Sequence, residues 1–407
     1  MKTSKAERIY RVVMLIIITA LISSIITAVV VNERITSSSS IKNIAEGDGT
    51  TGIETTLAAI RTILEEEYIG ELDDERMLEM AVKGYVAGVG DEYTAYYTPE
   101  EMNQEYDTAM GNYVGIGIYM IVNYEEGTIT IVEAMENSPA LEAGLQENDL
   151  ITKVDGEEVT VDNVSEISDK IKGEEGTSVK LEIKRGEEEF EVEIERRRIE
   201  VSHIESRMLD GNIAYIQVLD FDGGVAKEFK ENYEQLKSEG ATSLIIDIRS
   251  NGGGVVDEAI DMLEMICDNS STLLIETDKD GKETIIKSEA EPIIDIPIVV
   301  LVNGSSASAS EIFAGALKDH NKATIIGTQT YGKGVIQTLM RLSDGSGLKT
   351  TTEEYCTPNR NKINKVGIEP NIVVELPADI EELTDENDTQ LQRAIAVSYT
   401  HLTLPTI

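Results

Sequence analysis

The 407-residue sequence is poor in several side chains on which folding and catalysis commonly depend. It contains no Trp, 4 Phe, 3 His and 2 Cys. Two cysteines cannot make a disulfide framework, and the apolar helical pattern around Cys267 predicts a buried thiol. The histidines have no ligand spacing, so we expect no metal site. The cores must therefore be built from Ile, Val and Leu.

Basic side chains are also scarce. The sequence has 35 Lys and Arg against 76 Asp and Glu, a formal net charge of −41. Residues 1–31 carry four basic side chains and one acidic, so the excess of acid belongs to the rest of the chain. Such a field repels phosphate backbones and anionic headgroups, which excludes nucleic acid as an expected ligand.

The N-terminus has a charge-free apolar run of 20 residues, 12–31, which is long enough to span a bilayer as a helix. Four basic residues precede it within residues 1–11, and this asymmetry keeps that end in the cytoplasm. No small-residue cleavage site follows the run. We therefore expect a cytoplasmic tail, an uncleaved single-pass anchor in the cell membrane, and an extracytoplasmic remainder.

Beyond the anchor the pattern changes several times. The segments are a Ser- and Gly-rich linker, a stretch with helical spacing, a domain of short strands with two helix-like pieces, a strand–helix alternation, and a tail without periodicity. The strands of the alternation are uniformly apolar, which indicates an α/β layer covered on both faces. We expect the tail to be foreign and without function. In order, the segments are 32–55, 56–112, 113–197, 198–394 and 395–407.

A string of serines and alanines, "GSSASASE" at 304–311, follows an apolar strand and leads into a helix. Ser308 and Glu311 fit the capping box S-x-x-E. A hydroxyl at a strand-to-helix turn can also be a nucleophile, because the N–H of Ala309 would then point at the developing oxyanion. The two geometries are nearly the same, so the string alone leaves both interpretations open.

The choice between them depends on a base. His320 ends the same helix, about 16 Å from its start, so a Ser-His-Asp triad is not expected. Lys333 lies between two glycines in "YGKGVIQ", and burial would lower its pKa enough for it to take a serine proton. Gln337 could hold the amine through its amide oxygen. The alternative is a solvent-exposed lysine in a turn.

Two glycine-rich stretches have a nucleotide interpretation. Gly327–Lys333 nearly matches a phosphate-binding loop, but Gly334 replaces the metal-binding Ser or Thr and a strand-like segment follows, so we expect no ATP binding. The stretch "RSNGGG" at 249–254 follows an apolar strand. It is either a tight turn or the source of a second N–H group that completes an oxyanion hole with Ala309.

In the β-rich domain, "YVGIGI" at 113–118 is a glycine-containing loop that enters a strand. Such a loop can bind a chain terminus, because free N–H groups hold the carboxylate while the strand edge pairs with the peptide. The alternative is an ordinary hairpin.

Together these segments resemble the carboxy-terminal processing protease family, tail-specific serine peptidases with an inserted PDZ domain. The similarity covers residues 56–394. Its marks, in the order of the family, are "YVGIGI", "SPALEAGLQENDLITKVDG", "LIIDIRSNGGG", "VLVNGSSASASEIFAGALKD", "IIGTQTYGKGVIQ" and "YCTPNRNKINKVGIEPNI". The resemblance implies an α/β protease core with an inserted PDZ domain, an N-terminal helical region and the transmembrane helix.

The resemblance also implies roles for individual residues. Ser308 would be the nucleophile, Lys333 the general base and Gln337 its polar support, with the N–H groups of Ala309 and Gly253 as the oxyanion hole. The carboxylate-binding loop would consist of Tyr113, Val114, Gly115, Ile116, Gly117 and Ile118. The sequence departs from the family at residues 88–97, where an Asp-Pro-His-Ser-like turn is common, and at Arg360-Asn361, which replaces a glycine.

We therefore expect a membrane-anchored serine endopeptidase with a Ser–Lys dyad. Its partners would be proteins or peptides with unstructured C-terminal tails and the membrane, and a homo-oligomer is compatible with the pattern. The resemblance implies no metal or organic cofactor. The main alternative is a catalytically silent PDZ scaffold or signalling protein on the same fold.

Overall fold

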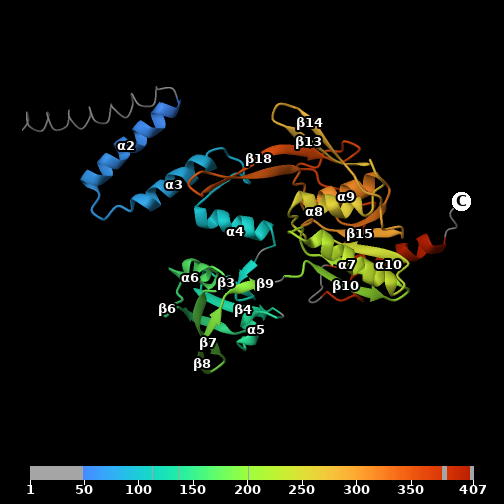
Figure 1. Ribbon diagram of the computed structural model, residues 1–407, viewed down its shortest axis with the longest axis horizontal. Helices are drawn as coiled ribbons and strands as arrows, with labels where there is room; N and C mark the ends of the chain where they lie inside the picture. Colours follow the sequence, from blue (N-terminus) through green and yellow to red (C-terminus); the bar gives the residue numbers. More distant parts are fainter. Residues whose placement is uncertain (1–48, 112, 136, 200, 378–382, 404–407) are drawn as a thin grey trace, which may run out of the picture. The chain divides into compact units, whose positions relative to one another are not determined.

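The computed structural model describes residues 49–111, 113–135, 137–199, 201–377 and 383–403 (Figure 1). The predicted cytoplasmic tail and anchor lie outside these residues. Within the described ranges, no helix is long and apolar enough to cross a membrane. The chain divides into two compact units, Met1–Val82 and Lys83–Ile407.

The N-terminal helical region predicted from residue 56 contains α2, Gly49–Glu67, and α3, Asp74–Ala87. Helix α2 starts inside the segment 32–55, so the predicted end of the linker is wrong. Apolar side chains continue the helical spacing back to Ile53, and the Thr56 hydroxyl donates to the Gly52 carbonyl one turn earlier, at 2.7 Å. A third helix, α4, Pro99–Ala109, begins with Thr98 as cap, as its T-P-E-E sequence predicts.

The β-rich domain is confirmed. Its antiparallel sheet has the order β3-β4-β5-β7-β8, with the short β6 paired to β5. The buried positions on β7 alternate, as expected for a sheet with one face in the core. The elements are β3 Ile118–Asn123, β4 Thr128–Ala134, α5 Pro139–Glu142, β5 Leu150–Val154, β6 Glu157–Glu158, α6 Val164–Ile171, β7 Ser178–Arg185 and β8 Glu188–Glu195.

A two-stranded neck joins the start and the end of this domain. Strand β2, Tyr113–Gly115, pairs antiparallel with β9, Arg197–Ile199. The chain therefore enters and leaves this domain at the same place, as expected for a domain inserted into another. The neck lies close to the predicted boundaries at 113 and 197.

The α/β core has the predicted alternation. Its sheet has the order β10-β11-β12-β15-β16-β19; β10 is an antiparallel edge strand and the other pairs are parallel. Every residue of β12 and β15 is buried. The strands are β10 Ile204–Leu209, β11 Ile213–Val218, β12 Ser243–Asp247, β15 Ile298–Val302, β16 Ala323–Gly327 and β19 Ile372–Val373.

Helices cover both faces of this sheet. Ile246 and Val300 pack with the first face's helices, which are α7 Val225–Ser238, α8 Val256–Glu264 and α9 Ala309–Asp319. Their neighbours Ile245 and Val299 point the other way and pack with α10, Thr389–Thr403. This explains why the strands are apolar at consecutive positions.

A second sheet in the core was not predicted. It has the order β1-β18-β13-β14, and β17 also pairs with β18 (Figure 1). Its strands come from both sides of the β-rich domain in sequence, so no local pattern shows that they meet. They are β1 Ala95–Tyr97, β13 Thr272–Asp278, β14 Glu283–Lys287, β17 Val335–Arg341 and β18 Gly347–Cys356.

The predicted tail, residues 395–407, starts within helix α10, and its foreign origin stays a prediction. Helix α10 continues through Thr403, and Val397 and Ser398 are 8% and 1% exposed. The Tyr399 hydroxyl donates to the Asp210 carbonyl at 3.1 Å. Ile395 and Val397 therefore pack against the second face of the sheet.

Both cysteine thiols are free. Cys267 is 0% exposed, and burial raises its pKa to about 11, so it is an inert core side chain as predicted.

Candidate active site

Ser308 lies at the turn between β15 and α9, immediately before the first helical residue. Its backbone has φ 55° and ψ −118°, a region that a residue with a side chain rarely adopts and that costs about 1–3 kcal/mol. The Ser308 N–H donates to Glu311 Oε2 at 3.0 Å, which is the backbone half of the predicted capping box. The strain is consistent with a hydroxyl held in a fixed position at the helix start.

Two other serines of the string have structural partners. The Ser306 hydroxyl donates to the Ile248 carbonyl at 2.7 Å, and the Ser310 hydroxyl donates to the Asn251 carbonyl at 3.0 Å. Both side chains are 0% exposed. They attach the string to the turn after β12, whereas Ser308 is half-buried. Its hydroxyl is therefore the better candidate for contact with a substrate.

The predicted oxyanion residues lie next to each other. A Cβ atom on Gly253 would lie 2.8 Å from Ser308 Cβ and 3.0 Å from the Ala309 nitrogen, and Gly253 has φ 103°. A glycine is therefore required for this close approach. The Gly253 N–H, however, donates to Asn251 Oδ1 at 2.8 Å. Its role in an oxyanion hole stays a prediction, and that bond would have to open.

Lys333 is half-buried, so it is not the fully solvent-exposed turn lysine of the alternative interpretation. Burial lowers the pKa of the lysine, and the nearby Lys349 lowers it further against the opposing carboxylates of Glu92 and Asp91. Its Nζ lies 4.5 Å from the centre of the Tyr93 ring. Within the described ranges, this Nζ donates no hydrogen bond to Ser308 Oγ or to another acceptor.

Glu311 connects the serine turn to the lysine turn. Its carboxylate is 0% exposed and, besides the Ser308 N–H, it accepts hydrogen bonds from the Thr330 hydroxyl at 2.5 Å, the Gly332 N–H at 2.7 Å and the Lys333 N–H at 2.8 Å. These amides of the Gly327–Lys333 loop therefore face a carboxylate and not a phosphate, and β17 follows. Sequence reasoning saw only the helix cap and missed this connection.

Tyr355 makes a second connection that sequence reasoning missed, although it is the tyrosine of the "YCTP" mark. Its hydroxyl lies 3.0 Å from the Ser308 carbonyl oxygen and 2.5 Å from the Lys333 carbonyl oxygen. The side chain is 2% exposed, and burial raises its pKa well above the ordinary value. A neutral hydroxyl therefore holds both backbones.

Gln337 lies on β17, and its Nε2 donates to the Thr351 hydroxyl on β18 at 3.2 Å. Thr351 in turn donates to Asp91 Oδ2 at 2.7 Å. Asp91 and Tyr93 both belong to the segment 88–97, which departs from the family pattern. The structure thus brings the departing segment to Lys333, the predicted base.

The predicted carboxylate loop, residues 113–118, lines a cavity of about 350 Å³ together with Met120, Ile171 and Lys172. The Ile116 carbonyl accepts from the Ala140 N–H at 2.8 Å. A Cβ atom on Gly117, which has φ 74°, would lie 2.4 Å from Ser138 Cβ. The loop is thus fixed against α5, with an apolar groove between β3 and the end of α6.

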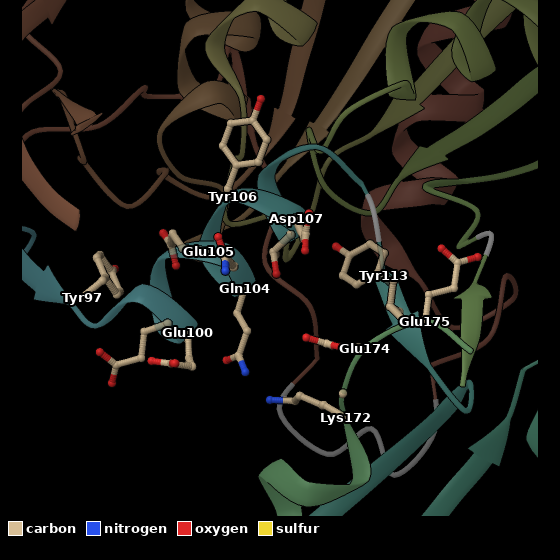
Figure 2. A pocket seen from close by; sticks show the side chains of 15 residues that line it. Tyr97, Glu100, Gln104, Glu105, Tyr106, Asp107, Tyr113, Lys172, Glu174 and Glu175 are labelled. Atoms are coloured by element: carbon tan, nitrogen blue, oxygen red, sulfur yellow. The ribbon is translucent and has the colours of Figure 1, made fainter. Parts of the chain in front are cut away.

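A second cavity of about 880 Å³ is lined by α4 and residues 172–175, and it shares Tyr113, Val114 and Lys172 with the groove. Figure 2 shows Gln104 and Lys172 directed toward the same space from these two segments. The Tyr113 hydroxyl donates to Asp222 Oδ2 at 2.5 Å, which attaches the start of the loop to the α/β core.

Fold and site together define the class: a serine-peptidase fold with an inserted PDZ domain. The model of peptidase family S41 matches residues 212–374, and the PDZ domain model matches residues 130–185. The chain belongs to the carboxy-terminal processing protease family.

Curated relatives support this membership. The chain is 36% identical over 315 residues to the carboxy-terminal processing protease CtpA of Bacillus subtilis (strain 168), covering 77% of this chain and 67% of that protein. It is 35% identical over 316 residues to a "Probable CtpA-like serine protease" of Staphylococcus haemolyticus (strain JCSC1435), covering 77% and 63%. The chain thus spans about two thirds of the length of these relatives.

A solved structure shares the fold. A protein of Bacteroides fragilis NCTC 9343 assigned to the S41 proteases is 16% identical with a TM-score of 0.51, covering 83% of this chain and 93% of that one.

Proposed function

We propose that this chain is a serine endopeptidase that binds the C-terminal tail of a protein in its PDZ groove and hydrolyses peptide bonds at Ser308. The observation that carries the proposal is the buried Glu311 carboxylate, which holds the N–H groups of Ser308 and Lys333 in one network. A silent scaffold would have no need of a strained serine joined to a lysine whose pKa burial has lowered.

The reaction follows from these groups. Lys333, once neutral, takes the proton of Ser308 as Oγ bonds to the substrate carbonyl carbon, and the N–H of Ala309 stabilises the oxyanion. Lys333 then gives the proton to the leaving amine as the C–N bond breaks. Water hydrolyses the ester, passing a proton through Lys333 back to Ser308 Oγ. The lysine side chain has to turn from Tyr93 toward Ser308 for the first step.

The PDZ groove suits an apolar C-terminus. Ile118, Met120 and Ile171 line it, while the loop 113–118 lies at its end, where N–H groups can hold a carboxylate. The substrates would be unstructured tails, since an extended chain is needed for strand pairing. In a strongly acidic protein, such a groove would select by shape and apolar contact more than by charge.

We also propose that residues 12–31 anchor the chain in the cell membrane with the peptidase outside. The support is the charge-free length of the run and the four basic residues before it. An anchored chain stays in the membrane fraction after alkaline carbonate extraction, whereas a chain without an anchor is released.

The test of the peptidase compares Ser308→Ala and Lys333→Ala with Ser305→Ala, an exposed serine of the same string. We expect the first two variants to lose cleavage of a protein with an apolar unstructured tail, and Ser305→Ala to retain it. Mass spectrometry of the products and thermal unfolding of each variant are measured together. Cleavage by folded Ser308→Ala would contradict the assignment of Ser308 as the nucleophile. Binding of the tail without cleavage by the unaltered chain would favour the scaffold.

A further inference from the structure

A turn far away in sequence lies against the predicted base. Thr351 donates to Asp91 across 260 positions of the chain, and Asp91 Oδ2 also accepts from the Thr94 hydroxyl at 2.5 Å. Two residues along, the Tyr93 ring lies under Lys333 Nζ at 4.5 Å. Strand β1 pairs with β18 immediately after this turn, which fixes its register. The turn, residues 91–94, therefore contacts the Lys333 side chain directly and reaches Gln337 through Thr351.

Hydrogen-bond direction decides how the Gln337 amide is oriented. Burial raises the pKa of Asp91, but hydrogen bonds from Thr94 and Thr351 outweigh this effect, so its pKa is lowered and the carboxylate is an acceptor. The single proton of the Thr351 hydroxyl is thus committed to Asp91. Thr351 Oγ1 can then only accept from Gln337, which must present its amide nitrogen there.

Because the nitrogen of the Gln337 amide faces Thr351, the amide oxygen is left as an acceptor. The ammonium group of Lys333 can donate only to such an acceptor. We propose that Asp91 and Thr351 are positioning residues: they fix the Gln337 amide so that its oxygen is left to accept from Lys333 when the lysine turns toward Ser308. Before that step, the Tyr93 ring holds the charged ammonium. This inference rests on the proposed peptidase function and assigns the segment that departs from the family pattern to the active site.

The first test is Thr351→Val, which removes the hydroxyl and keeps the β-branched shape, with Thr351→Ser as the matched control. We expect kcat on a tailed substrate to fall about 10- to 100-fold in Thr351→Val with little change in KM, and to recover in Thr351→Ser. The double variant Thr351→Val with Gln337→Ala should be no slower than Gln337→Ala alone, because both remove the same interaction.

The outcomes separate the two proposals. Additive losses in the double variant, or a Thr351→Val enzyme as fast as the unaltered chain, would overturn the positioning role and leave the peptidase intact. Absence of cleavage by the unaltered chain, with no labelling of Ser308 by a serine-reactive probe, would remove the peptidase function and this inference with it.

The second test is the pH profile of Tyr93→Leu against Tyr93→Phe. A ring under the ammonium stabilises the protonated lysine, so its loss lowers the pKa of Lys333 and more neutral base is present at lower pH. We expect the acidic limb of kcat/KM to move down by about half to one pH unit in Tyr93→Leu and to stay in place in Tyr93→Phe. An unmoved limb in Tyr93→Leu would overturn the role of the ring.

Discussion

Ser308 and Lys333 could be chosen from the sequence because each lies in a short motif of the family. The residues that hold them could not be chosen in the same way. Tyr355 acts through a hydroxyl on a strand of the unpredicted sheet, and the Thr351–Asp91 contact joins segments 260 positions apart. The sequence predicts Glu311 as part of a helix cap. Its bonds to the turn that contains Lys333 depend on the parallel pairing of β16 with β15, which the sequence does not show.

Glu311 gives a prediction at the scale of a single atom. In Glu311→Gln, the new amide group would face backbone N–H donors, so at least one buried donor loses its acceptor. Lost hydrogen bonds to a charged group cost about 1.5–3 kcal/mol. We expect a lower free energy of unfolding by about that amount and a larger relative loss of cleavage, measured by chemical denaturation and by kcat. Glu187→Gln on an exposed turn is the matched control; equal effects of the two substitutions would contradict the assigned role.

Among the elements, those with a local pattern were predicted and those built from distant strands were not. The apolar runs of β12 and β15 indicate a covered parallel sheet from composition alone. Strand β1 has only three residues, so its sequence carries too little periodicity to be recognised, and β18 depends on it and on β13. The turn before β1 was therefore seen only as a departure from the family.

The connection between the neck and the core contains a titratable pair. His203 lies just before β10, is 5% exposed, and has Nδ1 2.7 Å from Asp220 Oδ1. Burial lowers the pKa of His203, but Asp220, with Asp222 and Glu228 also facing the ring, raises it by more. Because the pKa is raised in the folded state, the pair contributes stability below the ordinary pKa of about 6.5, and this contribution is lost as the pH rises through the folded value.

We therefore predict that His203→Gln lowers the free energy of unfolding more at pH 5.5 than at pH 8.5. Denaturant titrations at the two pH values measure it. Asp220→Asn should remove the same pH dependence, and the double variant should add nothing further. An equal loss at both pH values would show that His203 contributes packing alone.

At the scale of the whole molecule, the order of the PDZ domain and the α/β core was predictable because the sequence pattern changes where one fold class gives way to another. What the sequence could not show is how the PDZ loop meets the core. The Tyr113 hydroxyl donates to Asp222, and the neighbouring Phe221 donates its N–H to the Gly253 carbonyl at 3.0 Å. Tyr113, at the start of the predicted carboxylate loop, thus bonds to Asp222, and the residue before Asp222 bonds to Gly253, which lies beside Ser308.

This arrangement predicts how cleavage depends on the groove. Met120 lines the groove on β3, whereas the next residue, Ile121, points away and is 62% exposed. A carboxylate in an apolar pocket repels an apolar tail and its terminal carboxylate. We expect Met120→Asp to raise KM for a tailed substrate about 10- to 200-fold, and Ile121→Asp to leave it unchanged.

A substrate ending in a C-terminal amide separates capture from chemistry, because it lacks the charge that the loop would hold. Its KM should already be high with the unaltered chain and should rise less in Met120→Asp than the KM of the free-acid substrate, because the amide loses the apolar contact but meets no charge repulsion. The kcat at saturation should stay similar. Thermal unfolding of both variants checks that the domain remains folded. If folded Met120→Asp cleaves the free-acid substrate with an unchanged KM, capture by the groove is not the step that brings tails to Ser308, since removing the apolar contact would then have cost no binding.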